Sequence, residues 1–203
     1  MTGMDSVNLI ALSTFAAIAA FTPGPNNLML AASGANFGLR RTIPHICGVT
    51  VGFLSLVIMA SLGLSSLFVF FPHILDIAQF AGFLFLFYLS WKIATAAPPE
   101  GAETTASPLS FGTALLFQFI NPKAFVVITS SVTVYVGRAD NLILSTAVIT
   151  AVFAVVTIMA TILWTYGGTL IGHMLRDRRA LRGFNFAMAG LLLFTLMPVL
   201  LGT

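Results

Sequence analysis

The sequence Pro23-Gly24-Pro25-Asn26-Asn27 interrupts an apolar, uncharged segment that runs roughly from Val7 to Phe37. An uncharged segment of about 20 residues or more is long enough to span a bilayer as a helix. Pro23 and Pro25, however, lack backbone N–H groups, and their rings clash with the preceding helical turn. We therefore expect two half-helices that meet at an unwound break. Because freed backbone groups at membrane depth are tolerated only inside protein or beside a polar cavity, this break predicts a binding site.

The break also has a direction. Proline suits the first position of a helix, so Pro25 is expected to begin the second half-helix. The N–H groups of Asn26, Asn27 and Leu28 would then point into the break and form the positive end of a helix dipole, which suits an anion such as a carboxylate. The alternative is a proline kink that serves packing alone. Two prolines followed by two amides favour the binding site.

Composition places the chain in a membrane. Of its 203 residues, 58% are hydrophobic and only 7% are charged, whereas ordinary soluble domains contain about 25% charged residues. A soluble protein of this size has too little interior to bury so much apolar sequence, so we expect an all-α integral membrane protein. The net charge of +3 comes from basic residues scattered at helix ends. This pattern indicates loop orientation and argues against nucleic-acid binding.

Six apolar segments predict six transmembrane helices. They run roughly over residues 7–37, 43–71, 74–97, 109–136, 142–175 and 184–201. Their periodicity adds nothing, because the segments are expected to be apolar on all sides. The polar stretch 98–108 divides the chain into a first three-helix repeat, 1–97, and a second three-helix repeat, 109–203.

The two halves are predicted to be inverted repeats. Thr22-Pro23 aligns with Asn121-Pro122, 99 residues later, so the first and fourth helices are expected to be broken at matching places. Three helices in each half would make the halves enter the membrane in opposite directions. Inverted repeats with matching broken helices are a recurring transporter architecture, in which the site lies near the midplane at the repeat interface.

The basic residues predict the orientation. Arg40, Arg41, Lys92 and four arginines between residues 176 and 182 lie in alternate connections, which must share one side of the membrane. On the opposite side the only lysine or arginine is Arg138. By the positive-inside rule the first side is the cytoplasm. The linker 98–108 is then cytoplasmic, and both termini are expected outside the cytoplasm.

Lys123 is the only charged residue well inside a predicted span, and it directly follows the second break. A lysine at bilayer depth costs at least about 2.5–3.5 kcal/mol, so it normally faces a cavity or a partner. The inverted repeat would bring it against the first break. Two roles stay open: Lys123 binds a substrate carboxylate or couples transport to protons, or its ammonium only satisfies loose carbonyls at the breaks.

The predicted substrate-binding residues are those of the two breaks and their amides: Pro23, Gly24, Pro25, Asn26, Asn27, Gln118, Asn121, Pro122 and Lys123. No acid lies clearly inside a span, so a substrate ammonium would be met by backbone carbonyls, by the side-chain amides or by aromatic faces. No catalytic residue, metal site or cofactor is predicted, because the sequence has no triad, phosphate-binding loop or metal-ligand spacing.

Two further features are expected to be structural. His45 follows Pro44 and is predicted in the first turn of the second helix, at the membrane interface, although a histidine there could titrate near neutral pH. Gly48 and Gly52 form a G-x-x-x-G pattern that predicts close helix packing, and Gly167-Gly168 with Gly172 predicts the same.

Several motifs are specific when taken together: Thr22-Pro23-Gly24-Pro25-Asn26-Asn27, Gly34, Gly38-Leu39-Arg40-Arg41, Gly48-Val49-Thr50-Val51-Gly52, the run from Phe80 to Lys92, Phe111 and Gln118-Phe119-Ile120-Asn121-Pro122-Lys123-Ala124. In these motifs the chain resembles the LysE/RhtB family of bacterial amino-acid exporters. The Gln118-Phe119-Ile120-Asn121 run is most similar to the cysteine/O-acetylserine exporter branch. Phe85 and Ser90 depart from the family pattern, which often has Tyr and Gly there, so polar substrate contacts of the third helix do not carry over.

The resemblance implies a transporter, not an enzyme, that exports amino acids or their derivatives across the bacterial inner membrane, coupled to the proton gradient. The expected partners are an amino-acid substrate, protons and the lipid bilayer, with a homodimer left open. A channel, or an exporter of another small solute such as a metal ion or a weak acid, stays the alternative. A membrane-embedded enzyme would need clustered acids, histidines or nucleophiles, which the sequence does not offer.

Overall fold

The structure, a computed structural model, describes residues 6–64, 72–95, 107–136, 141–175, 177–195 and 197. Within these residues it contains seven α-helices, one π-helical turn and no strand, so the expected all-α class is confirmed for this part of the chain. In chain order the elements are α1 (Ser6–Phe21), α2 (Pro25–Met59), the π-helical turn η1 (Ala60–Leu64), α4 (Pro72–Ala94), α5 (Phe111–Gln118), α6 (Pro122–Tyr135), α7 (Leu142–Met174) and α8 (Arg178–Phe194). Most of the predicted linker 98–108 and the two chain ends lie outside the described residues.

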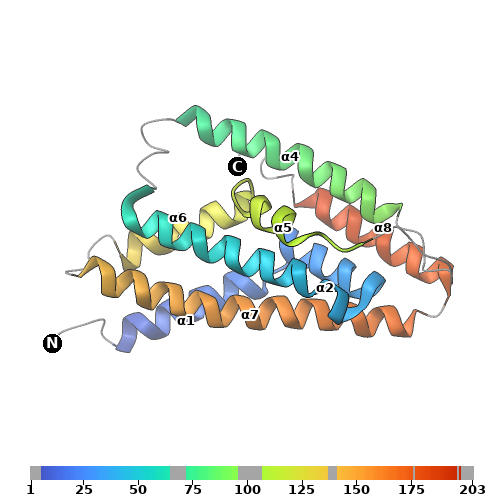
Figure 1. The fold of residues 1–203 in the computed structure, drawn as a ribbon, viewed down its shortest axis with the longest axis horizontal. Helices are drawn as coiled ribbons and strands as arrows, with labels where there is room; N and C mark the ends of the chain where they lie inside the picture. The colour runs from blue at the N-terminus through green and yellow to red at the C-terminus, as the bar shows by residue number, and fades with distance from the viewer. Residues whose placement is uncertain are drawn as a thin grey trace.

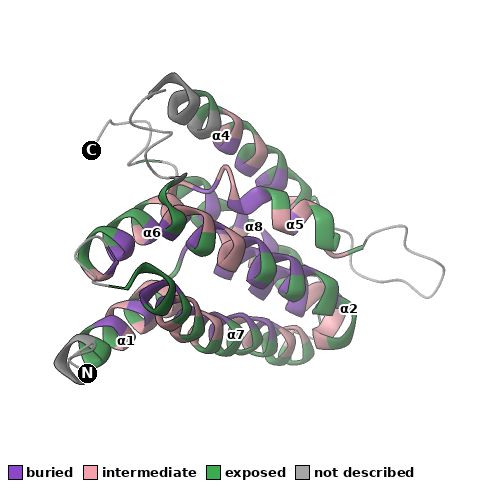
Figure 2. Cartoon of the chain, turned by 60° about the vertical axis from the view of Figure 1, so that its left-hand side comes forward, coloured by how far each residue is buried: buried purple, intermediate pink, exposed green. Residues whose placement is uncertain are grey.

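Long apolar helices with exposed apolar faces make this a membrane protein. By length and composition alone, residues 25–63, which cover α2 and most of η1, suffice to cross a bilayer, and so does α7. The pair α5 and α6, bent by 55°, forms a third crossing if it is counted as one span. The outward faces of α4 and α7 are exposed (Figure 2) and carry large apolar side chains such as Phe80, Leu84, Ile158 and Met159. Exposed apolar surface on this scale marks contact with lipid or another apolar partner.

α2 folds back on itself at Gly38. The φ angle of Gly38 is 78°, a left-handed conformation that glycine adopts without the steric cost of a side chain. The Ser33 hydroxyl lies 3.2 Å from Nδ1 of His45, whereas twelve residues of straight helix would separate the two by about 18 Å. Residues 25–37 and 39–59 are therefore two helical runs that lie side by side, and we call them the α2 hairpin. The sequence predicted a boundary in this region, between residues 37 and 43.

The α2 hairpin occupies the centre of the bundle. α7 and α5 pack along it, α8 also contacts it, α1 lies on α7, and α4 pairs with α8. The hairpin turn, the end of α4 and the start of α8 gather at one end of the molecule, on the right in Figure 1. Five basic residues whose side chains the structure describes belong to these segments, and we call this the basic end: Arg40, Arg41, Lys92, Arg179 and Arg182.

Glycines allow close helix contacts on both sides of the hairpin. A Cβ atom on Gly48 or Gly52 would collide with backbone carbonyls of α5, and one on Gly168 or Gly172 would collide with carbonyls of residues 31 and 35. The predicted packing role of these four glycines is confirmed. Gly167 differs, because a Cβ atom there would meet open space.

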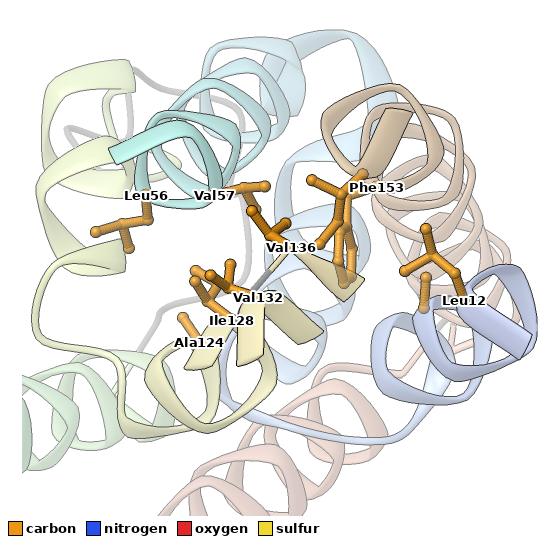
Figure 3. Close-up of a cluster of buried hydrophobic side chains, with 10 residues drawn as sticks. Leu12, Leu56, Val57, Ala124, Ile128, Val132, Val136 and Phe153 are labelled. Carbon is orange, nitrogen blue, oxygen red and sulfur yellow. The ribbon is translucent and has the colours of Figure 1, made fainter. Parts of the chain in front are cut away.

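Two apolar clusters lie on either side of the helix breaks. The first joins α1, the end of α2, α6 and α7 at the end opposite the basic residues, and Figure 3 shows Leu12, Leu56, Val132 and Phe153 among its members. The second joins residues of α2, α4, α5 and α8 and is built from Leu28, Met29, Leu86, Leu89, Phe117 and Leu192. Gly24 of the first break and Asn121 of the second are buried, whereas Thr22 and Pro23 are exposed.

One predicted boundary is wrong. The last apolar segment was expected to begin at residue 184, but α8 begins at Arg178. The Asp177 carboxylate accepts a hydrogen bond from the backbone N–H of Arg179 at 3.1 Å and caps the new helix. Aspartate is among the preferred N-cap residues, so the capping residue and not the apolar boundary sets the helix start.

Candidate substrate site

The first break separates α1 from α2. α1 ends at Phe21, Gly24 is extended, and Pro25 takes the first position of α2, as predicted. The N–H group of Leu28 donates to the Gly24 carbonyl at 3.0 Å. The expectation that this N–H points into the break is therefore wrong, because the first helical hydrogen bond of α2 already uses it.

Asn27 holds the first break together. Its amide nitrogen donates to the carbonyl oxygen of Ala20 at 2.7 Å and to that of Thr22 at 3.0 Å. The last carbonyls of a helix have no partner within the helix, so one buried amide satisfies two acceptors that α1 leaves open. The Asn27 side chain is 7% exposed.

The second break separates α5 from α6. α5 ends at Gln118 and α6 begins at Pro122, and the two helices are bent by 55°. The side-chain oxygen of Asn121 accepts a hydrogen bond from the backbone N–H of Lys123 at 3.1 Å. Asn121 is therefore the N-cap of α6, a position for which asparagine is strongly preferred.

The two breaks meet at Lys123. Its ammonium nitrogen Nζ donates to the carbonyl oxygen of Thr22 at 2.8 Å, across 101 residues of sequence. A Cβ atom on Gly24 would lie 2.8 Å from Cδ and 3.0 Å from Nζ of Lys123, so only glycine leaves room for this side chain. The structure places Lys123 against the first break, as expected from the sequence, and its ammonium satisfies a freed carbonyl there.

A second contact joins the breaks through two amides. Nδ2 of Asn26 donates to Oε1 of Gln118 at 2.8 Å, and Nε2 of Gln118 donates back to Oδ1 of Asn26 at 3.1 Å. Nε2 of Gln118 also donates to the Ala114 carbonyl at 2.9 Å. Gln118 is completely buried, and buried amides need such partners.

A cavity of ≈ 70 Å³ lies beside the two breaks. The breaks contribute Gly24, Asn26, Asn27, Asn121 and Lys123 to its lining, and the other lining residues are Ala19, Ala20, Val49, Phe53, Ala124, Val127, Phe153, Thr157, Ala160 and Thr161. Four predicted site residues do not line it: Pro23, Pro25, Gln118 and Pro122. Of the described residues in the lining, Lys123 alone has an ionisable side chain. Small apolar walls around one ammonium and several amides suit a small molecule that carries a negative charge.

α7 contributes four residues to the cavity lining that were not predicted: Phe153, Ala160, Thr157 and Thr161. Two of them, Thr157 and Thr161, carry hydroxyl groups. They belong to a row of buried hydroxyl residues on one face of α7, together with Ser145, Thr146 and Thr165. The expectation that the spans are apolar on all sides is therefore wrong for α7. The spacing of threonines by four residues, which places them on one helix face, was the available signal.

A second cavity of ≈ 310 Å³ lies nearer the basic end, between residues 25–37, the end of α4 and the residues before α5. Its lining is Met29, Ala32, Ser33, Asn36, Phe37, Leu89, Lys92, Ile93, Thr95, Ser107, Pro108 and Leu109. Asn36 exchanges two amide hydrogen bonds with Asn185 of α8, at 2.8 and 3.0 Å. This cavity therefore has polar side chains on one wall and Lys92 on another.

His45 lies beside the second cavity, inside the helix bundle. It is completely buried, and Nδ1 contacts the hydroxyl of Ser33, which lines that cavity. The expected first-turn position is wrong because the helical run begins directly after Gly38, so His45 lies more than one turn inside it. Nε2 of His45 is buried and has no hydrogen-bond partner among the described residues.

Two facing helix breaks around a small cavity, inside a bundle with apolar outer faces, define a helical membrane transporter. The chain belongs to the LysE type translocator family, whose sequence profile matches residues 17–201. The resemblance inferred from the motifs is therefore confirmed, and the family marks the protein as a transporter and not an enzyme.

Curated relatives share this assignment. The cysteine/O-acetylserine efflux proteins of Shigella flexneri serotype 5b (strain 8401) and of Escherichia coli (strain K12) are each 28% identical to this chain over 192 residues. The alignments cover 94% of this chain and 96% of each relative. No solved structure matches the chain.

Proposed function

We propose that this protein exports small amino acids or their derivatives from the cytoplasm across the bacterial inner membrane, driven by the proton gradient. The observation that carries the proposal is the position of the Lys123 ammonium, which lies where two broken helices meet in the wall of a small cavity. Membership of the LysE type translocator family supports transport. The names of the curated relatives support amino-acid efflux.

The substrate carboxylate would bind between Lys123 and the start of α2. Asn26 and Asn27 line the cavity and belong to the first turn of α2, where helical N–H groups lack internal acceptors. These N–H groups and the helix dipole favour an anion. A carboxylate would compete with the Thr22 carbonyl for the ammonium, and a hydrogen bond between two charged groups is the stronger one.

The rest of the substrate would contact α7 and two aromatic rings. Thr157 and Thr161 offer hydroxyls, and the rings of Phe53 and Phe153 pack edge to face with centroids 5.4 Å apart. Among the described residues no acidic side chain lines the cavity, so the substrate ammonium would use hydroxyls, carbonyls and aromatic faces. Four alanines in the lining favour a short side chain. Cysteine and O-acetylserine are therefore the first substrates to test.

We infer six spans arranged as two inverted repeats, 1–97 and 109–203, around the linker 98–108. Two matching helix breaks support this arrangement, and the reversal at Gly38 would divide α2 into two spans. The basic end would face the cytoplasm by the positive-inside rule, which leaves both termini outside. A homodimer is compatible with the apolar outer faces.

Export would proceed by alternating access. The glycine contacts of the α2 hairpin with α5 and α7 lie between the site and the basic end, so they would keep the cytoplasmic side closed in this state. Parting of these contacts would open the site to the cytoplasm. The backbone breaks at residues 22–24 and 119–121 would absorb the rotation, since hinges are short segments at the ends of elements.

The test is counterflow in proteoliposomes loaded with unlabelled cysteine or O-acetylserine. Saturable uptake of the labelled amino acid, stimulated by the internal load, would support a transporter. Flux that never saturates and ignores the internal load would indicate a channel instead. Lack of counterflow for every small amino acid tested would remove the proposed substrate class. Among the described residues no three metal-ligating side chains gather, so no structural observation favours a metal ion.

A further inference from the structure

His45 occupies an unusual place in the bundle, between the two cavities. Ser33, its hydrogen-bond partner, lines the cavity near the basic end. Val49, one helical turn after His45 and thus on the same helix face, lines the cavity with Lys123. The imidazole therefore stands in the packed layer that separates one cavity from the other.

The hydrogen bonding of His45 leaves one ring nitrogen free to bind a proton. Nδ1 lies 3.2 Å from the Ser33 hydroxyl, and Nε2 has no partner in the described part of the chain. In the tautomer whose Nδ1–H donates to Ser33, Nε2 carries an open lone pair. Most buried polar groups are paired, so an unpaired buried nitrogen calls for a functional explanation.

The charged groups around His45 would not stabilise a permanently protonated imidazole, because no described acidic side chain lies buried beside it. α1 and α5 present no ionisable side chain to it, α7 has only the exposed Tyr166 and His173, and α6 has Lys123 and Tyr135. Within the α2 hairpin, the basic residue one turn before His45 is Arg41. The ionisable side chains of α4 are Tyr88 and Lys92, and α8 has exposed arginines. Among the side chains that the structure describes, the only acid is Asp177, which is exposed and caps α8.

We propose that His45 carries the coupled proton of the transport cycle. Nε2 takes up a proton from the side of the Lys123 cavity, and the resulting imidazolium loses a proton toward the second cavity. A buried charge without a counter-ion is costly, so protonation favours a state in which the hairpin parts from its neighbours and opens the layer. Release of the proton and binding of the amino acid then return the layer to its closed state, with one proton moved inward for each substrate moved outward.

This inference rests on the proposed function, and the experiment separates the two. Proteoliposomes with an acidic lumen are given radiolabelled cysteine at a neutral external pH, and accumulation is compared with counterflow at equal pH. The wild type is expected to show both. His45→Gln is expected to keep counterflow and to lose accumulation by about tenfold or more, the usual scale of a coupling free energy. His173→Gln, at the exposed end of α7, is the matched control and is expected to keep both.

The outcomes are distinct. Accumulation by His45→Gln equal to that of the wild type would overturn the role of His45 and leave the exporter intact. Counterflow without accumulation in the wild type would overturn proton coupling, and the role of His45 with it. Absence of wild-type counterflow would overturn the proposed function itself.

A second measurement covers the case in which His45→Gln does not fold. Addition of cysteine to the protein in weakly buffered detergent is expected to release protons, which a pH indicator dye detects. Ser33→Ala keeps the imidazole but removes its partner, so it is expected to shift the pH at which release is half-maximal. A pH profile of proton release identical to that of the wild type in Ser33→Ala and in His45→Asn would contradict the proposal.

Discussion

The two helix breaks both leave backbone groups without helical hydrogen bonds, and different residues bind those groups at each break. At the second break the start of α6 is capped from within, because the Asn121 side chain accepts the Lys123 N–H. At the first break Gly24 precedes α2 and offers no side-chain cap. The side-chain amide of Asn27 donates instead to carbonyls at the end of α1. The α6 terminus is thus satisfied by the protein, whereas the α2 terminus keeps donors available for a ligand.

This difference assigns separate tasks to the two breaks. The first break supplies donors at the positive end of a helix, and the second break supplies the charge, through Lys123. An anion would therefore bind at the first break and be held by the second. If the two breaks contributed equally to the site, equivalent substitutions at each break would change transport and stability by equal amounts. Four experiments test that, from the largest expected effect to the smallest.

Removal of the Lys123 charge should have the largest effect. Lys123→Met keeps an unbranched chain but loses the ammonium, so counterflow per folded transporter should fall about 10- to 100-fold, since a hydrogen bond to a charged group contributes about 1.5–3 kcal/mol. Arg182→Met, at an exposed position of α8 that lines neither cavity, is the control and should retain most activity. Equal activity of both variants would leave Lys123 with a role in folding only.

Gly24→Ala should displace Lys123 without unfolding the bundle. The new Cβ atom would lie 2.8 Å from Cδ of Lys123, and the flexible side chain can retreat. We expect counterflow to fall about 5- to 10-fold, which corresponds to the lower part of the usual 1–3 kcal/mol cost of overpacking. Gly112→Ala, where a Cβ atom meets open space, is the matched control. A thermal unfolding midpoint that drops while transport stays normal would contradict this prediction.

The Asn26–Gln118 pair should show strong coupling between the breaks. Asn26→Leu or Gln118→Leu alone leaves an amide without its partner and should cost about 1–3 kcal/mol of stability, whereas the double variant should cost less than the sum. Thermal or denaturant unfolding in detergent of all four proteins gives the interaction free energy. If the stability change of the double variant equalled the sum of the two single changes, the reciprocal hydrogen bonds would not couple the breaks.

The smallest effect is expected at the cap of the second break. Asn121→Ala should lower stability by about 1 kcal/mol, the typical contribution of an N-cap. The apparent KM of counterflow should stay unchanged, because the cap serves the backbone of α6. A large increase in KM would instead place Asn121 in contact with the substrate and remove the contrast between the breaks.

Both breaks were predictable from sequence because proline acts locally. Pro23, Pro25 and Pro122 lack the N–H groups that would continue a preceding helix, so each favours a helix end before it or a helix start at its own position. The position of Lys123 was predictable for a related reason, since an isolated charge inside an apolar span must find a partner. These features depend on single residues and their immediate neighbours.

The features that were missed depend on contacts between distant segments. Thr157 and Thr161 look like ordinary residues of an apolar helix until the α2 hairpin shows which face of α7 is buried. His45 was placed at the interface because Pro44 suggested a helix start, yet the reversal at Gly38 moved that start upstream. The prediction that the N–H group of Leu28 points into the break was wrong, because that group donates to the Gly24 carbonyl.

The reversal at Gly38 limits how the protein can move. One glycine joins the two helical runs, so the connection has no slack, and a run cannot slide along its neighbour without breaking the Ser33–His45 contact. We therefore expect Asn27 and His45 to move together, as parts of one rigid hairpin that rotates about the unwound backbone at residues 22–24. Binding of an anion beside Asn27 would then displace the His45 imidazole directly, without intermediate rearrangements.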